Sequence, residues 1–351
     1  MTRRKAHLPA MGTRFLSTTE VPIRRLFPPQ SMIAVLFIFG KTLTNTSSMA
    51  MTSRPMMTPH VTDWVEHCPA KINLRLSVLG RRVDGYHDLR SIVAQIGLED
   101  HLEIHWSDQW TEDEFECSVE GLTENPTENL VMRALKAFRG QYPFSGGVRV
   151  YLDKKIPVGA GLGGGSSDAA GMLRGLQVMW GNPLGGDVIG ALATQLGADV
   201  PLFLNEGFSL MSGIGDVLEP AEGIRDWVKA YRIAVIKPWW SVNTAWAYRS
   251  MAEMKAYSPE ERLEDIEKLR KKGDLSGFLK NDFRQVVDAR YPTNTLLYAG
   301  LNARATVFAE MSGSGSAGFA LFESESDWDF IRREVMYCWG AKAQCEEVAF
   351  I

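Results

Sequence analysis

The residue types best suited to chemistry in this chain gather in one glycine-rich stretch, Pro157–Asp168, with the sequence PVGAGLGGGSSD. Five of the seven residues from 159 to 165 are glycine, the residue that adopts positive φ freely and lets a ligand approach the backbone. Ser166, Ser167 and Asp168 follow, and such side chains are expected to cap a helix. Because N–H groups at a helix N-terminus attract anions, this stretch predicts a phosphate-binding loop.

Two better-known phosphate loops fit this stretch poorly. It lacks the Gly-Lys-Ser/Thr ending of a Walker A loop. Gly159, Gly161 and Gly164 match the dinucleotide fingerprint, but a Rossmann unit also needs a second strand that ends in an acid. Asp187 instead precedes a second predicted helix. A Rossmann oxidoreductase is therefore a remote alternative, and a tight packing turn without a ligand is another.

A carboxylate and an ammonium group elsewhere in the chain could serve in phosphoryl transfer. That reaction requires the substrates to be positioned and the charge on the transferring group to be offset. Asp199 lies in a predicted turn before a short apolar run, where it could take the proton of an attacking hydroxyl. Lys71 opens an alternating strand, and beside Asp199 it would keep that carboxylate ionised and attract a γ-phosphate. From spacing alone, a surface aspartate and a solvated lysine are the simpler interpretations.

The strand that carries Lys71 is predicted from strict alternation over residues 71–79, the pattern of a half-buried strand. Its apolar face holds Ile72, Leu74, Leu76 and Val78, and its polar face holds Lys71, Asn73 and Arg75. The pair Asp84-Gly85 signals a turn over residues 81–87.

The rest of the chain predicts a mixture of helices and strands. Strands are expected at 91–97, 101–106, 147–152 and 319–322, and helices at 129–139, 167–180, 187–196, 259–272 and 327–339. Because these elements follow no regular βαβ order, an α+β fold is favoured over a doubly wound α/β fold. We expect a leader at 1–60, an N-terminal domain at 61–228 and a C-terminal domain at 229–351.

Composition excludes several classes of function. The net charge is −4, so no basic surface calls for nucleic acid or an anionic membrane. The four cysteines form no C-x-x-C pair, and the histidines show no ligand spacing. We therefore expect idle thiols, a reducing cytoplasmic compartment and no metal other than a nucleotide's Mg²⁺.

The leader has a composition of its own, with eight Lys or Arg and a single acid, Glu20. Its apolar run at 33–40 is too short to span a bilayer. Three interpretations stay open: a mis-assigned start, an organelle transit peptide of the plastid type, and a disordered tail. We favour the first. The candidate true starts are Met51, Met56 and Met57.

Three motifs together resemble the superfamily of galactokinase, homoserine kinase, mevalonate kinase and phosphomevalonate kinase. They are Pro69–Leu74, Pro157–Asp168 and Met311–Ser316, and they occur in the superfamily's order. Within it, the chain is most similar to the family of 4-diphosphocytidyl-2-C-methyl-D-erythritol kinases of the non-mevalonate isoprenoid pathway. Four stretches carry that closer resemblance, which covers about residues 65–350: Pro69–Leu74, Arg82–His87, Gly161–Ser167 and Leu196–Pro201.

The resemblance implies a two-domain α+β kinase fold with the active site in the cleft between the domains, and ATP with Mg²⁺ as cofactors. It implies that Lys71 and Asp199 are catalytic and that Asn129 lies near the adenine. The residues expected to contact the nucleotide phosphates are Pro157, Val158, Gly159, Ala160, Gly161, Leu162, Gly163, Gly164, Gly165, Ser166 and Ser167.

The resemblance also implies an acceptor site. Tyr86 and His87 match residues that bind the cytosine ring, and Asn73 lies near the methylerythritol hydroxyls. Thr244 and Tyr248 keep the spacing of a second cytosine-binding pair, although Asn243 and Ala245 replace the usual prolines.

Two other functions stay open at this point. The chain could be another kinase of the superfamily, of the mevalonate or homoserine type, or a nucleotide or metabolite sensor without catalysis. A monomer or a homodimer is expected.

Overall fold

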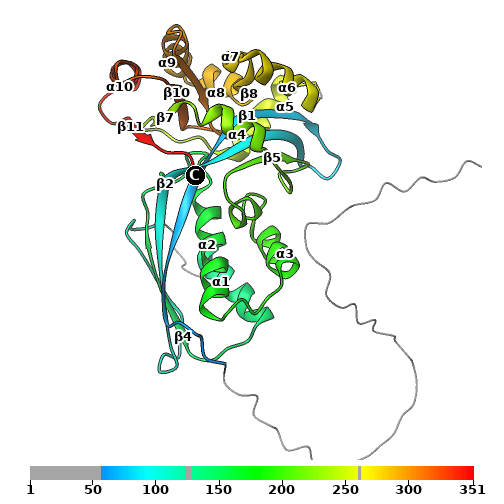
Figure 1. Cartoon of the computed structure of the whole chain (residues 1–351), viewed down its shortest axis with the longest axis vertical. Coiled ribbons are helices and arrows are strands. Elements are labelled where there is room, and N and C mark those ends of the chain that lie inside the picture. The colour runs from blue at the N-terminus through cyan, green and yellow to red at the C-terminus, as the bar shows by residue number, and fades with distance from the viewer. Residues whose placement is uncertain (1–56, 123–127, 260–261) are drawn as a thin grey trace, which may run out of the picture. The chain divides into compact units, whose positions relative to one another are not determined.

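The computed structural model describes residues 57–122, 128–259 and 262–351. Most of the predicted leader, with Met51 and Met56, therefore lies outside the described residues. The described ranges mix helices with two sheets (Figure 1), which confirms the α+β fold class.

The first sheet has seven strands and is built around one long hairpin. The hairpin consists of β1 (Asp63–Arg81) and β2 (His87–Ser107). The path β3-β4-β2-β1-β8 adds β3 (Glu114–Cys117), β4 (Gly147–Asp153) and β8 (Lys280–Asn281). Off this path, β5 (Phe208–Ser212) pairs with β2 and with β6 (Val217–Pro220). The strands expected at 91–97 and 101–106 are thus two parts of β2.

The second sheet has four strands in the order β11-β7-β10-β9. These are β11 (Gln344–Val348), β7 (Arg232–Lys237), β10 (Gly318–Phe322) and β9 (Val307–Met311). All its neighbouring strands run antiparallel. The predicted strand at 319–322 is β10.

Three helices lie along the long hairpin (Figure 1): α1 (Leu130–Gln141), α2 (Gly164–Met179) and α3 (Gly186–Leu196). A short 3₁₀ helix, Pro201–Leu204, follows α3. The remaining helices are α4 (Glu222–Val228), α5 (Thr244–Met254), α6 (Leu263–Lys272), α7 (Leu275–Phe278), α8 (Arg284–Arg290), α9 (Pro292–Asn302) and α10 (Glu325–Trp339). The start of α10 is fixed by a reciprocal capping box between Ser324 and Asp327.

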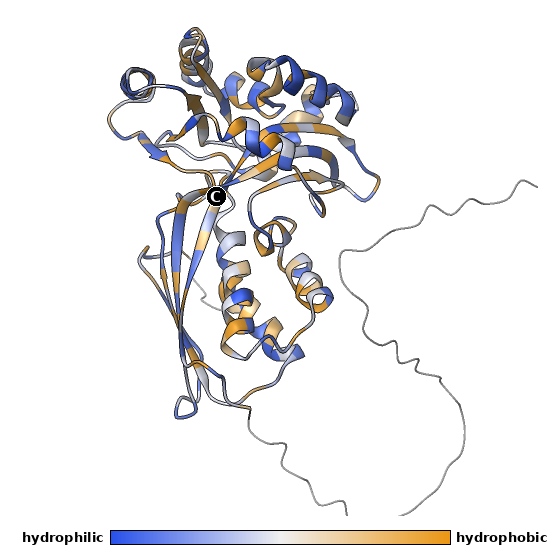
Figure 2. Ribbon diagram, viewed as in Figure 1, coloured by the Kyte–Doolittle hydropathy of each residue, from blue (hydrophilic) through white to orange (hydrophobic). Residues whose placement is uncertain are grey.

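The single apolar face predicted for residues 71–79 is wrong. Ala70, Ile72 and Leu74 pack in one hydrophobic cluster with residues of both sheets, whereas Leu76 and Val78 belong to the other cluster. The pairing of β1 with β2 shifts between Pro69 and Ala70 and again between Asn73 and Arg75. The second shift places one extra residue, Leu74, in β1 and so reverses the face that later residues of this strand present. Figure 2 shows polar and apolar residues alternating along these strands.

The prediction of a half-buried strand is also wrong at residues 71–75. Lys71, Asn73 and Arg75 are all buried, with 5%, 4% and 8% of their surface exposed. The reason is that the edge of β1 away from β2 is covered. The N–H of Lys71 donates to the oxygen of Leu162, the N–H of Asn73 donates to Ser312, and β8 pairs with β1 at Arg75 and Leu76. A central strand covered on both faces offers no solvated side to its polar residues, so these three must find partners inside the protein.

The predicted division at 228/229 has no sharp counterpart in the pairing of strands. Strand β8 comes from the C-terminal part and pairs with β1 at Arg75 and Leu76. Near the end of the chain, the backbone oxygen of Ala349 accepts a hydrogen bond from N–H of Gly97. The boundary itself stays a prediction. None of the helices in the described ranges has the length and apolar character needed to cross a bilayer.

Candidate active site

The glycine-rich loop is held between β1 and a second glycine-rich turn, residues 312–317. The oxygen of Leu162 accepts a hydrogen bond from N–H of Lys71 at 2.9 Å, and the oxygen of Ala160 accepts one from Ala317 at 3.0 Å. Gly161 has φ +81°, and a Cβ there would lie 2.5 Å from the backbone oxygen of Ser312. Glycine is therefore required at this position both by conformation and by space.

The helix after the loop starts earlier than predicted. It begins at Gly164, and its N-cap is Gly163, which is left-handed with φ +74° and makes no side-chain cap. Ser166, Ser167 and Asp168 are therefore residues of α2 itself, and the prediction that they cap the helix is wrong. A residue that must be left-handed and lie beside Lys71 and Phe203 has no room for a side chain, so glycine takes the capping position without offering a side-chain acceptor.

Below the loop lies a buried triad of charged residues: Asp100, Lys154 and Asp168. The Nζ of Lys154 is 2.5 Å from a carboxylate oxygen of Asp100 and 2.9 Å from one of Asp168. The other oxygen of Asp100 accepts hydrogen bonds from N–H of Lys155 and Ile156. The triad thus joins β2, the start of the loop and the first turns of α2.

The electrostatics of this triad follow from its burial. Burial raises the pKa of Asp168 to about 7, against the opposing effect of Lys154. The pKa of Lys154 is raised by its two carboxylate neighbours in spite of burial. The cost of removing the Lys154 ammonium group from water is offset only when both carboxylates are present as partners.

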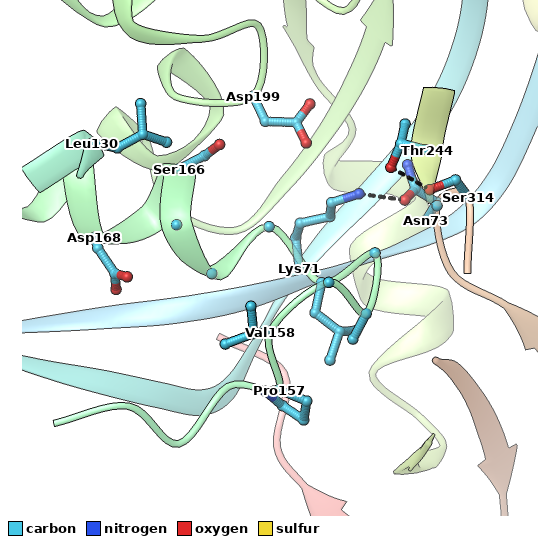
Figure 3. A pocket seen from close by; sticks show the side chains of 18 of the residues that line it. Lys71, Asn73, Leu130, Pro157, Val158, Ser166, Asp168, Asp199, Thr244 and Ser314 are labelled. Atoms are coloured by element: carbon cyan, nitrogen blue, oxygen red, sulfur yellow. Dashed lines mark hydrogen bonds between the residues drawn. The ribbon is translucent and has the colours of Figure 1, made fainter. Parts of the chain in front are cut away.

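The loop forms one wall of a cavity of about 490 Å³. All residues from 157 to 166 line it, together with Lys71, Asp199 and Asn129. The C-terminal part supplies the opposite side, with Thr244, Tyr248, Phe283 and Ser314 (Figure 3). Among the predicted site residues, only Ser167, Tyr86 and His87 are outside the lining. The structure therefore gathers parts of β1, the loop, the turn at Asp199 and α5 around one space.

Lys71 and Asp199 point into the same part of this cavity (Figure 3). Burial lowers the pKa of Lys71, and the negative charge of Asp199 opposes that shift. Nζ of Lys71 donates a hydrogen bond of 2.6 Å to Oδ1 of Asn73. Lys71 is therefore a desolvated cation whose position is fixed by its own strand and whose charge faces the aspartate.

The two predicted asparagines have structural partners as well as a place in the lining. Asn73 donates to the hydroxyl of Ser91 at 2.8 Å, and its backbone N–H donates to Ser312. The side chain of Asn129 accepts from N–H of Val131 and caps α1. These hydrogen bonds fix the position of each asparagine in the cavity wall.

The predicted acceptor residues form a more open group. His87 stacks on Tyr248 with ring centres 4.7 Å apart, while Tyr86 is 61% exposed. Burial, and then the nearby Arg81, lower the pKa of His87. The hydroxyls of Thr244 and Ser314 are 2.8 Å apart, so α5 and the second glycine-rich turn meet at the cavity (Figure 3).

Sequence reasoning missed several residues of this site, among them Phe283, Ser314 and Lys154. Ser314 lies within a motif that was recognised, but that motif alone does not tell which residue reaches the cavity. Lys154 was missed because a lysine next to a strand end is usually solvated, and only the tertiary fold shows the two carboxylates around it.

Comparisons with known proteins agree with this geometry. Residues 129–207 match the model of the GHMP kinases N terminal domain. The crystal structure of a 4-(cytidine 5'-diphospho)-2C-methyl-D-erythritol kinase is similar with a TM-score of 0.66 and 31% identity, covering 82% of this chain and 99% of that one. A homoserine kinase from Cytophaga hutchinsonii is similar with a TM-score of 0.60, 87% and 97% coverage and 16% identity, which shows the shared fold only.

A sequence relative makes the family specific. The 4-diphosphocytidyl-2-C-methyl-D-erythritol kinase of Chlorobaculum parvum is 39% identical over 260 residues, which are 73% of this chain and 88% of the relative. The resemblance seen in the motifs is thereby confirmed. The chain belongs to the family of 4-diphosphocytidyl-2-C-methyl-D-erythritol kinases.

Proposed function

We propose that this protein transfers the γ-phosphoryl group of ATP to a hydroxyl of 4-diphosphocytidyl-2-C-methyl-D-erythritol, a step of non-mevalonate isoprenoid biosynthesis. The observation that carries the proposal is that Lys71 and Asp199 share a cavity with the glycine-rich loop. The family supports the substrate. No observation on the cavity favours mevalonate, homoserine or a purely sensory role.

The loop is proposed to bind the triphosphate. Its backbone and the first turn of α2 present N–H groups at a helix N-terminus, where the helix dipole favours negative charge. The contacts of Ala160 and Leu162 to the neighbouring strand and turn hold the loop in place before a ligand arrives. Such preorganised donors act at little cost in reorganisation.

Asp199 and Lys71 are proposed to act on the reacting groups. The carboxylate of Asp199 accepts the proton of the acceptor hydroxyl while the oxygen of that hydroxyl forms a bond to the γ-phosphorus. The bond from that phosphorus to the β–γ bridging oxygen breaks, and ADP leaves with the electron pair. Lys71 offsets negative charge on the transferring group.

Mg²⁺ would enter with ATP as part of the substrate. Two oxygen atoms near the loop fit it: Oγ of Ser167 and Oδ1 of Asp168 are buried without a hydrogen-bond partner among the described residues. Oxygen donors of this kind are the ligands that Mg²⁺ prefers. When bound, the ion would neutralise phosphate charge, and Ser167 or Asp168 would help to hold it.

The cytidyl group is proposed to bind at Tyr86 and His87 and at the pair Thr244 and Tyr248, with Asn73 near the methylerythritol hydroxyls. Tyr86 offers an exposed aromatic face on which a base can stack. The lowered pKa of His87 keeps its imidazole neutral near pH 7, so it can donate from one nitrogen and accept at the other.

The proposed setting is the cytoplasm, with a small molecule as the partner, no nucleic acid or membrane partner, and a monomeric or homodimeric state. A net charge of −4 supports the proposed absence of a nucleic acid partner and of a membrane partner. All four cysteines, which lie in the described ranges, are free thiols, as a reducing compartment favours.

The test is a coupled ADP-release assay with a panel of acceptors that contains the cytidyl substrate, mevalonate and homoserine. We expect turnover with the cytidyl substrate alone. Comparable turnover of mevalonate would reject the substrate assignment, and ATP binding without transfer to any acceptor would reject catalysis.

A further inference from the structure

A cluster of three potential metal ligands lies outside the active site, on the long hairpin. His67 of β1 and Glu99 and His101 of β2 each offer one ligand atom, and these atoms all lie within 4.8 Å of one another. Nδ1 of His67 is 3.1 Å from Oε2 of Glu99, and the two imidazole rings are 4.8 Å apart. The spacing of these histidines along the sequence does not reveal the cluster, because strand pairing joins residues that are far apart in sequence.

The register of the hairpin explains the cluster. His67 is directly opposite His101, and the next pair on the same face joins Pro69 to Glu99. Directly opposite residues have Cβ atoms about 4.5–5.5 Å apart, which is a distance that two imidazoles can bridge through one ion. Their neighbours Cys68 and Leu102 are fully buried in the core, so the three ligands are on the opposite face from α2.

We propose that His67, Glu99 and His101 form a binding site for a divalent transition-metal ion of the Zn²⁺ or Ni²⁺ type. Two imidazole nitrogens and one carboxylate oxygen suit these ions better than Mg²⁺, which prefers oxygen ligands. Zn²⁺ bonds of about 2.0–2.2 Å place ligand atoms roughly 3–3.5 Å apart. Small rotations of exposed side chains therefore close the site, and water completes the coordination.

A competing positive charge lies beside the site. Nζ of Lys155 is 3.5 Å from Nδ1 of His101, and a bound cation would repel it. The side chain of Lys155 is 49% exposed, so it can turn into solvent at small cost. Removal of this ammonium group should therefore strengthen metal binding.

The metal site does not depend on the proposed kinase activity, but it lies close to the residue that holds the start of the glycine-rich loop. Glu99 and His101 flank Asp100, the carboxylate that holds the start of the glycine-rich loop. An ion bound across β1 and β2 would tie the two strands together at this point. Because metal binds the folded pairing, it should also raise the unfolding temperature of the whole protein.

The experiment is calorimetric titration of the full, untagged chain, freed of metal with a chelator, with Zn²⁺ and separately with Ni²⁺. We expect one saturable ion per chain at this site and no such binding of Mg²⁺. Loss of a residue that only supports a metal ligand costs about 10–100-fold in affinity. His67→Ala and His101→Ala should each weaken binding by at least that much, and Lys155→Met should strengthen it.

His105→Ala is the matched control, because His105 is an exposed histidine on the same strand with its own carboxylate partner, Asp63. It should bind metal as the wild type does. Glu99→Gln serves as a second test if a histidine variant does not fold, since it keeps the shape and removes the anionic ligand. Equal losses in His105→Ala and His67→Ala, unaltered binding in Glu99→Gln, or no saturable binding by the wild type would each overturn the proposal.

Discussion

The two walls of the active-site cavity are built by different means. The nucleotide wall is mainly backbone: the loop from Pro157 to Gly163 is fixed by hydrogen bonds to β1 and to residue 317, with a buried charged triad beneath it. The proposed acceptor wall is made of side chains from separate segments, among them Thr244 and Tyr248. His87, which stacks on Tyr248, and the largely exposed Tyr86 lie outside the lining.

This difference teaches where the protein can tolerate change. Backbone donors are independent of side-chain identity but demand glycine wherever φ is positive or space is absent. Side-chain sites permit substitution but lose their ligand contact when one aromatic residue is removed. We therefore expect changes to the nucleotide wall to act on ATP use, and changes to the acceptor wall to act on the second substrate.

The largest expected effect is at Asp199, where the two walls meet. Asp199→Asn keeps nearly the same volume and removes the proposed base, so turnover should fall by roughly 10²–10⁴. ATP binding, measured by calorimetry, should be retained because the loop is untouched. Near-normal turnover would show that Asp199 is not the base.

Gly161→Ala tests the nucleotide wall directly. A Cβ would lie 2.5 Å from the backbone oxygen of Ser312, on a residue with φ +81°, so kcat/KM for ATP should fall by about 10–100-fold. Gly159→Ala is the matched control: φ is also positive, +65°, but nothing lies within 4 Å of the new atom. Its loss should be clearly smaller, and an equal or greater loss would contradict a role for the tight contact.

Tyr86→Ala tests the acceptor wall. Stacking of a base on an aromatic ring contributes about 1–3 kcal/mol, so KM for the cytidyl substrate should rise roughly tenfold or more while KM for ATP stays within about twofold. Tyr337→Ala, at a tyrosine of α10 that is 87% exposed, should change neither constant. A rise in KM for ATP alone would show that Tyr86 acts on ATP binding and not on the cytidyl substrate.

The effect that is smallest in turnover concerns the triad under the loop, and it appears in stability. The pKa of Asp168 in the folded protein, about 7, exceeds its ordinary value of 3.8, so the folded state binds this proton more tightly than the unfolded state does. Its contribution to the free energy of unfolding should therefore fall as pH rises from about 4 to about 7, by at most about 1.4 kcal/mol per pH unit. Denaturant unfolding at several pH values should show a flatter dependence in Asp168→Asn. An unchanged slope would exclude Asp168 as its source.

Local sequence predicted the parts of the fold that depend on short-range rules. The helices near 129–139 and 187–196 and the strand at 147–152 lie where periodicity indicates. The loop is predictable because five glycines within seven residues favour a backbone with positive φ that a ligand can approach closely. The pairing of Lys71 with Asp199 came from the family's motifs, since no local rule joins residues so far apart.

What local sequence did not predict depends on pairing between strands. Alternation gives the period of β1 but not the points where a bulge resets it. For the same reason, neither Lys154 between Asp100 and Asp168 nor the approach of His67 to His101 is visible along the chain. Each arises from register, which is a property of the assembled sheet.

Two register shifts in the pairing of β1 with β2 have a consequence for how this sequence can vary in length. They lie on either side of a short segment, residues 70–74, whose orientation is set apart from the rest of the strand. Deletion of Leu74 would remove the shift between Asn73 and Arg75 and exchange the faces of the residues on one side of it. We infer that insertions and deletions in this family should be absent from this segment and frequent in the hairpin turn after Arg81, where a change of length leaves Lys71 in place.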